Sequence, residues 1–137
     1  SLHRFVRDLS AYARSLSIFR DERFWREDGA GGTLIMWHGV KLGAPDWSEA
    51  SRSLACTLSR AGEGEWVHLC LNAWREALSF ELPPPPPGRA WHRVLDTSLP
   101  PGEDLRLPPA APALPGGSYR LADRSVALLQ ALPVGPS

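Results

Sequence analysis

The first strong pattern along the chain is helical. Between residues 2 and 17, apolar residues recur at intervals of three and four, and arginine and aspartate lie largely on the other side. This spacing predicts one amphipathic α-helix, with an apolar stripe of Leu2, Phe5, Val6, Leu9, Tyr12, Ala13 and Leu16. A glycine-rich turn follows at 28–32. We therefore expect a helix and connector over 1–27 and a separate β domain over 28–137.

After residue 33 the hydrophobic period changes to two. Short alternating or apolar segments, separated by glycine and proline, predict strands at 34–37, 53–59, 66–72, 77–82, 91–97 and 126–132, with a weaker pattern at 119–121. Several short strands joined by turns are typical of a two-layer all-β domain. The expected fold is mainly β, an antiparallel β-sandwich preceded by one N-terminal amphipathic α-helix.

Two segments are rich in proline. Residues 83–87 are five consecutive prolines between two predicted strands. A stiff connector is the favoured interpretation, and a polyproline II ligand for another protein is the alternative. Residues 108–117 lack periodicity, so we expect a surface loop there, with the least order in the chain.

The two cysteines are predicted to face opposite ways. Cys56 is in step with Leu54 and Leu58, which we expect to point inward, whereas Cys70 is in step with His68 and is expected to point outward. A disulfide between them is therefore not expected. Isolated reduced cysteines are typical of the cytoplasm, so we expect a cytoplasmic location.

Composition narrows the choice of partners. The 137 residues suit one domain, and 43% hydrophobic residues suffice for a core. Fifteen basic side chains balance 15 acidic ones without a basic stripe, so a nucleic-acid partner is not expected. No run approaches the roughly 20 apolar residues of a membrane span, and no membrane partner is expected.

No catalytic or metal-binding motif is found. The histidines His3, His38, His68 and His92 are scattered, without the spacing of zinc ligands. No serine lies in a G-x-S-x-G elbow, and the glycines at 29–32 lack the lysine of a phosphate-binding loop. The carboxylates fall mainly in turns and on polar faces. The sequence predicts no catalytic residue, no metal and no cofactor.

Six tryptophans are the remaining candidates for binding. Trp37, Trp66, Trp74 and Trp91 lie on or beside predicted strands, where packing is the favoured role. Trp47 lies in a loop and is the better candidate for stacking on a sugar ring, with Trp74 as the second. For both residues, packing is still the favoured interpretation, and sugar binding is the alternative.

Three stretches in order resemble the C-terminal domain of isoamylase-type glycogen debranching enzymes, in the α-amylase superfamily. They are the motif at 37–47 (WHGVKLGAPDW) with the SRSLA that follows at 51–55, the motif at 69–83 (LCLNAWREALSFELP), and the motif at 91–97 (WHRVLDT) with RSVALL at 124–129 as a closing strand. Each motif alone is weakly specific, and the ordered set over residues 2–132 carries the resemblance.

The resemblance implies a role within a longer enzyme. Such enzymes have an N-terminal β domain, a catalytic (β/α)8 barrel and a C-terminal β-sandwich, and they hydrolyse α-1,6 branches of glycogen-like glucans with carboxylates of the barrel. None of those carboxylate motifs can be placed on this sequence, so no catalytic residue is carried over. The helix at 2–17 resembles the last barrel helix, and the chain, which opens on Ser1 and not on Met, is expected to be part of a longer protein.

Three functions follow as hypotheses. The first is a non-catalytic accessory domain that packs beside the barrel of a debranching enzyme. The second is an α-glucan-binding module that uses exposed aromatic residues, and the third is a protein-interaction module that uses residues 83–87. We also expect the helix face of Phe5, Leu9 and Tyr12 to fold onto the β domain or to pair with a second copy, because an apolar stripe of this kind needs a partner.

Overall fold

Seven β-strands follow one another along the part of the chain that the computed structural model describes, which is residue 11 and residues 34–48, 51–60 and 65–134. They are β1 (Leu34–His38), β2 (Ser53–Arg60), β3 (Glu65–Asn72), β4 (Leu78–Glu81), β5 (Arg89–Asp96), β6 (Ser118–Leu121) and β7 (Ser125–Pro133). Each occurs where the alternating pattern predicts a strand. The predicted helix at 2–17 lies outside the described residues except for Ala11.

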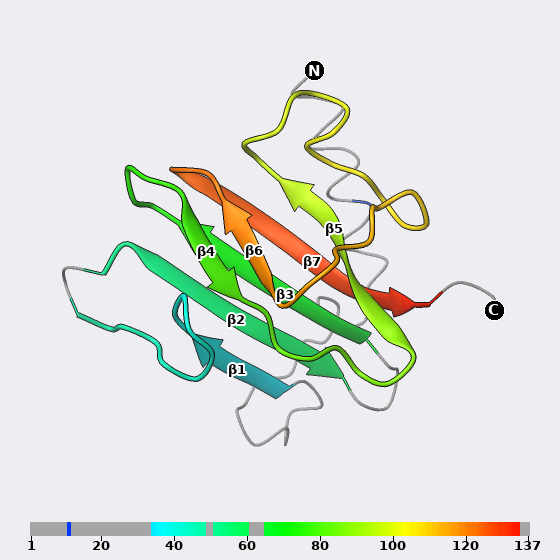
Figure 1. The fold of residues 1–137 in the computed structure, drawn as a ribbon, viewed down its shortest axis with the longest axis horizontal. Coiled ribbons are helices and arrows are strands. Elements are labelled where there is room, and N and C mark those ends of the chain that lie inside the picture. Colours follow the sequence, from blue (N-terminus) through cyan, green and yellow to red (C-terminus); the bar gives the residue numbers. More distant parts are fainter. Residues whose placement is uncertain (1–10, 12–33, 49–50, 61–64, 135–137) are drawn as a thin grey trace.

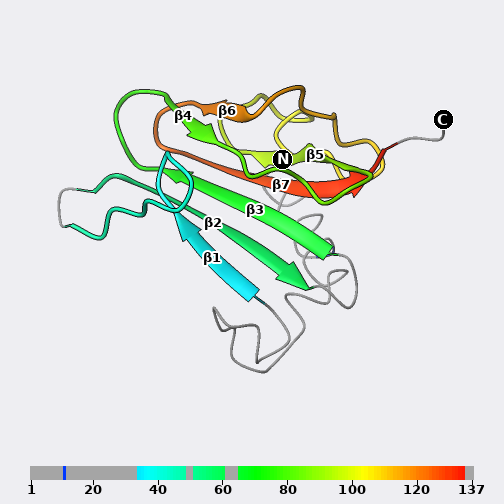
Figure 2. The same cartoon turned by 60° about the horizontal axis from the view of Figure 1, so that its bottom comes forward.

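The strands form two antiparallel sheets (Figure 1). The larger sheet has the order β1-β2-β3-β7-β5, and the smaller one pairs β4 with β6. Figure 2 shows the small sheet lying over β7 and β5, while β1 and β2 extend away from it. A mainly β fold built of antiparallel sheets is therefore confirmed.

The proline run carries the chain from the small sheet to the large one. The indole N–H of Trp91 donates a hydrogen bond of 2.7 Å to the Pro83 carbonyl. At the other end of the run, the Arg89 N–H donates to the Pro86 carbonyl at 3.1 Å. Both ends of the run are thus attached to β5, as a stiff connector between strands requires.

The five-stranded sheet is apolar on both faces, because its strands carry hydrophobic residues at odd and even positions alike. On one face, Ala55, Cys70 and Ala127 pack against Phe80 and Leu121 of the small sheet. On the other face lies a second cluster, built around Cys56, Leu58, Val67, Val94, Leu95 and Leu128. Each face therefore needs a cover.

The assignment of an outward face from the sequence was wrong, whereas Cys56, Leu58 and Val67, expected to point inward, are buried in a core cluster. His68 and Cys70, which we expected to point outward, are fully buried on the face that the small sheet covers. Leu54 and Cys56 lie on the opposite face. Alternation shows which residues share a face of a strand, but it does not show which face the second layer covers.

The prediction that the cysteines face opposite ways is confirmed. Cys56 and Cys70 are both free and buried, and they belong to different core clusters. Burial raises the pKa of the Cys56 thiol to about 11 and that of Cys70 to about 12. Since the thiolate is the reactive form, both side chains act as small apolar core residues.

The segment expected to be the least ordered instead covers the outer edge of β5. The N–H of Arg93 donates to the Pro112 carbonyl, and the N–H of Leu114 donates to the Trp91 carbonyl, both at 2.9 Å. Ala111 is buried in the core. An uncovered strand edge exposes unpaired backbone groups, and this pairing satisfies those of β5 despite the lack of any hydrophobic period.

Asn72 links the two sheets. Its buried side-chain amide nitrogen lies 3.2 Å from the carbonyl oxygen of Leu121 at the end of β6, and 3.0 Å from those of Glu76 and Ala122. Its side-chain oxygen accepts a 2.9 Å hydrogen bond from the Trp74 N–H. One side chain at the end of β3 therefore fixes the turn into β4 and the end of β6.

We predict that Asn72→Ala lowers the free energy of unfolding by about 2 kcal/mol or more, because several buried backbone groups lose their partner together. Urea unfolding followed by tryptophan fluorescence measures this change. Ser79→Ala, at an exposed position of β4, is the control and should change stability by less than about 0.5 kcal/mol. Equal stability of the two variants would contradict the proposed link.

Candidate docking surface

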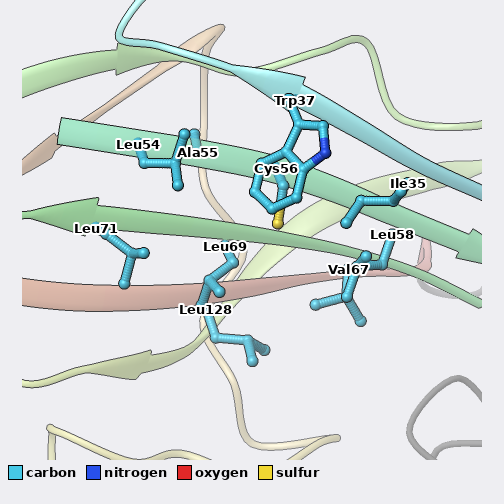
Figure 3. Close-up of a pocket in the computed structure, with 10 residues that line it drawn as sticks. All are labelled: Ile35, Trp37, Leu54, Ala55, Cys56, Leu58, Val67, Leu69, Leu71 and Leu128. Atoms are coloured by element: carbon cyan, nitrogen blue, oxygen red, sulfur yellow. The ribbon is translucent and has the colours of Figure 1, made fainter. Parts of the chain in front are cut away.

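An apolar hollow of about 250 Å³ lies on the face of the large sheet that is turned away from the small one (Figure 3). Its walls come from β1, β2, β3 and β7 and are hydrophobic throughout. The lining residues are Ile35, Trp37, Leu54, Ala55, Cys56, Leu58, Val67, Leu69, Leu71 and Leu128. We call this face over β1 to β3 the docking surface.

The described residues cover only about half of this face. Leu105, Leu107 and Ala111, from the segment between β5 and β6, pack on the core cluster that includes Val94 and Leu95 of β5. Over β1 to β3, by contrast, the leucine side chains remain partly exposed: Leu54, Leu69 and Leu71 are only half-buried. Contiguous apolar surface of this kind marks a site for another surface.

Trp47 stands at the margin of the docking surface. Its indole ring makes a T-shaped contact with Trp37, with ring centroids 5.4 Å apart and an interplanar angle of 73°. Trp47 nevertheless remains 64% exposed. The loop is held in place, because the Ser48 N–H donates to Asp46 Oδ1 at 3.0 Å and the Gly43 N–H donates to His38 Nδ1 at 2.8 Å. The exposed ring is thus presented by a fixed loop.

The structure places Trp74, the second aromatic candidate, in a different setting. It is half-buried in the turn after β3, and the guanidinium carbon of Arg75 lies 5.0 Å from its ring centroid. The two hollows that adjoin Trp47 are not lined by Trp74. The structure therefore does not bring the two candidates into one site.

A buried chain of hydrogen bonds crosses β1, β2 and β3 on the opposite face of the sheet. His38 Nε2 lies 3.0 Å from Thr57 Oγ1, which lies 2.9 Å from His68 Nδ1. Because His38 Nδ1 accepts from the Gly43 N–H, the His38 proton is on Nε2 and points to Thr57. The Thr57 hydroxyl then donates to His68, and the His68 proton is on Nε2. Among the described residues, that atom has no hydrogen-bond partner.

Burial keeps both rings neutral. It lowers the pKa of His38, and it lowers the pKa of His68 to about 4, with the nearby His38 as a further cause. The two ring centroids are 5.7 Å apart, so a charge on one would oppose a charge on the other. The pair was not evident in the sequence, where the histidines are scattered, because the strand register brings them together.

We predict that the domain loses stability as the pH falls from about 6.5 towards 4. The folded chain takes up the His68 proton less readily than the unfolded chain, so this contribution is fully present above pH 6.5 and is lost below it. A shift from 6.5 to about 4 corresponds to about 3 kcal/mol. Urea unfolding at several pH values measures the loss, and His68→Gln should remove most of it. If His68→Gln kept the pH dependence of the unmodified chain, His68 would not be its cause. His92→Gln is the histidine control and should keep that dependence.

Asp96 is the only buried carboxylate among the described residues. Its Oδ1 accepts from the N–H and the hydroxyl of Ser98, and its Oδ2 accepts from the hydroxyl of Tyr119. Burial and this last hydrogen bond raise the pKa of Tyr119. The carboxylate thus holds β6 against the end of β5, with no second buried carboxylate beside it, and its role is structural.

The described residues contain neither a cluster of potential metal ligands nor a helix that could span a membrane. No group of three or more potential ligands among them could hold a metal ion. Across residues 34–48, 51–60 and 65–134, no helix has the length and apolar character needed to cross a bilayer.

Comparison with known proteins identifies related sequences. Residues 36–114 match the family model described as "Isoamylase 1-3, C-terminal". The chain is 30% identical over 131 residues to isoamylase 3, chloroplastic, from Oryza sativa subsp. japonica, an alignment that covers 95% of this chain and 15% of the rice protein. It is 35% identical over 92 residues to isoamylase SU1, chloroplastic, from Zea mays, covering 66% of this chain and 11% of the maize protein.

A bacterial relative aligns over a similar span. Isoamylase from Pseudomonas amyloderamosa is 24% identical over 139 residues, which cover 94% of this chain and 17% of that protein. The chain therefore spans less than a fifth of the length of these relatives, and it matches a part of them that a family model describes as C-terminal.

Proposed function

This chain belongs to the isoamylase C-terminal domain family, and from that premise we propose that it is a non-catalytic accessory domain, a β-sandwich, of a glycogen debranching enzyme. The observation that carries the proposal is the docking surface, an apolar sheet face that the described chain leaves half open. We propose that the catalytic barrel of the parent enzyme covers it. The parent would hydrolyse α-1,6 branches with carboxylates of that barrel.

The docking surface has the chemistry of a permanent interface. Its exposed part consists of leucine, isoleucine and tryptophan side chains from three adjacent strands. Obligate interfaces are the more hydrophobic kind and resemble a domain core cut in half. Each leucine that becomes fully buried contributes on the order of 1 kcal/mol or more, so several together can hold two domains in a fixed arrangement.

The other predicted partners have less support. A protein-interaction module at residues 83–87 would need prolines that are solvent-exposed and free of Trp91. Pro84 and Pro87 are exposed, but Trp91 binds the Pro83 carbonyl and Arg89 binds the Pro86 carbonyl. The helix face of Phe5, Leu9 and Tyr12 lies outside the described residues, so its folding onto the β domain or its pairing with a second copy stays a prediction. The cytoplasmic location, expected from two free cysteines, also stays a prediction.

We predict that Leu69→Glu weakens association with the catalytic part at least tenfold, because it places a charge in the docking surface. The polypeptide encoded directly upstream would be produced separately and its affinity for this chain measured by calorimetry. Ser79→Glu, on an exposed position of the other sheet, is the matched control and should bind like the unmodified chain. Leu69→Thr, which carries no charge, tests the same position if the glutamate variant does not fold.

Two results would overturn the proposed docking. One is an upstream coding region without barrel strands and their carboxylates. The other is equal affinity of the Leu69 variants and the unmodified chain for the catalytic part.

We also predict that the chain alone releases no reducing ends from glycogen or from a branched dextrin. Glycosidases use two carboxyl groups on opposite sides of the scissile bond, and the single buried carboxylate of the described residues is bound by Ser98 and Tyr119. A reducing-sugar assay over a long incubation measures this, with a commercial isoamylase as the positive control. Release of linear chains by the purified chain would show that it is an enzyme in its own right.

A further inference from the structure

We infer that the loop carrying Trp47 is a surface binding site for a linear α-glucan chain, whose sugar ring stacks on the exposed indole. The choice of an α-glucan as the ligand rests on the proposed function. The site itself rests on four features of the described residues: the exposure of the ring, its support, the two hollows beside it and the polar groups around one of them.

The ring is exposed and supported at once. Trp47 is 64% exposed, and Trp37 braces it in a T-shaped contact at 5.4 Å. Pro45 precedes it by two residues, and the Asp46 side chain accepts a hydrogen bond from the Ser48 N–H. An aromatic surface that is already fixed loses little conformational entropy on binding. Trp47 can therefore serve as a rigid platform for a flat, partly apolar ligand.

Two hollows adjoin the ring, because Trp47 lines both. One, of about 330 Å³, is lined by Trp47 together with Asp46, Ser48, Ser51, Arg52, Ser53, Leu54, Leu71 and Ala73. The other, of about 360 Å³, is lined by Trp47 together with Ile35, Met36, Trp37 and Pro45. Both volumes fall within the range of about 300–1,000 Å³ that is usual for ligand sites. An exposed ring that lines two hollows offers space for more than one sugar unit of a chain.

The polar groups around the first hollow match the hydroxyl groups of a sugar. Three serines, a carboxylate and a guanidinium lie along its wall. Hydrogen bonds from Ser48 lower the pKa of Asp46, so its carboxylate is ionised at neutral pH and acts as an acceptor. The Arg52 Nη1 donates to the Ser51 carbonyl, which holds it along the wall. A pyranose ring, with C–H groups on its faces and hydroxyls at its edge, satisfies the indole and these groups together.

The site shares Leu54 and Leu71 with the docking surface. A glucan held on Trp47 would therefore lie beside the junction with the catalytic part. This position suits a branched polymer, because one of its chains can be held on the accessory domain while another enters the catalytic part.

The test uses the complete 137-residue chain and its Trp47→Ala variant. Maltoheptaose binding is measured by calorimetry up to millimolar concentration, and retardation is measured in native gels that contain glycogen. We expect Trp47→Ala to lower the affinity at least tenfold and to abolish the retardation. Trp47→Tyr should retain part of the binding, because it keeps a flat ring.

Three controls separate binding from folding and from docking. Val134→Ala removes another exposed apolar side chain and should bind like the unmodified chain, as should Trp74→Ala. Leu69→Glu should weaken docking to the catalytic part and leave maltoheptaose binding unchanged. Urea unfolding verifies that each variant is folded. If Trp47→Ala does not fold, the affinity of Trp47→Tyr for maltoheptaose is the deciding measurement.

Two results would overturn the inference. One is an unmodified chain that shows no saturable response to maltoheptaose. The other is a folded Trp47 variant with unchanged affinity. If the unmodified chain does not bind the oligosaccharide and Trp47→Ala weakens docking instead, Trp47 belongs to the interface, and the proposed accessory role stands without the glucan site.

Discussion

The architecture depends on a sheet that is apolar on both faces, of which the described residues cover one with the small sheet and the other mainly near β5. The two-stranded sheet closes one side through Phe80 and Leu121. On the other side, the segment before β6 covers the region near β5 through Leu105 and Ala111 and leaves β1 to β3 open. Because apolar surface in water is unfavourable, the second core is finished only when another surface is added.

Several buried polar side chains are linked to one another by hydrogen bonds, although His68 Nε2 has no partner among the described residues. Thr57 joins His38 and His68 across three strands, and Asp96 joins Ser98 to Tyr119. Buried hydrogen-bonding groups are costly without a partner, so each network fixes one strand arrangement over its alternatives. The networks and Asn72 act where the two sheets meet, and the leucine clusters supply most of the buried area.

The strands were predictable because alternation is local. The alternation of Leu54, Cys56 and Leu58 with their neighbours predicts a strand from local sequence alone. Alternation does not show which face of the sheet the second layer covers. In β3, residues on both faces are buried, with Val67 on one face and His68 and Cys70 on the other. The covered face is decided by the crossing of the proline run between the sheets and by the insertion of β7 between β3 and β5. Residues 108–117 were misjudged for a related reason, because their attachment to β5 uses backbone groups that carry no sequence signal.

Some features of the candidate site were also predictable from the sequence, and others required the fold. The exposure of Trp47 followed from its place in a loop with proline and aspartate, whereas its contact with Trp37 required the fold. The docking surface was present in the sequence as the set of residues expected to point inward. What the sequence lacked was the finding that half of this set still needs a cover. The pairing of His38 with His68 depends on strand register and could not be obtained from spacing.

The place of β7 in the large sheet also governs the order in which the domain can be completed. This last strand is not at an edge: it pairs with β3 on one side and β5 on the other. In chain order the meander of β1 to β3 comes before β7, so β5 can join the large sheet only after β7 has paired with β3. Deletion of β7 would therefore remove an interior strand and not a margin of the sheet, and it would leave β5 without its strand partner.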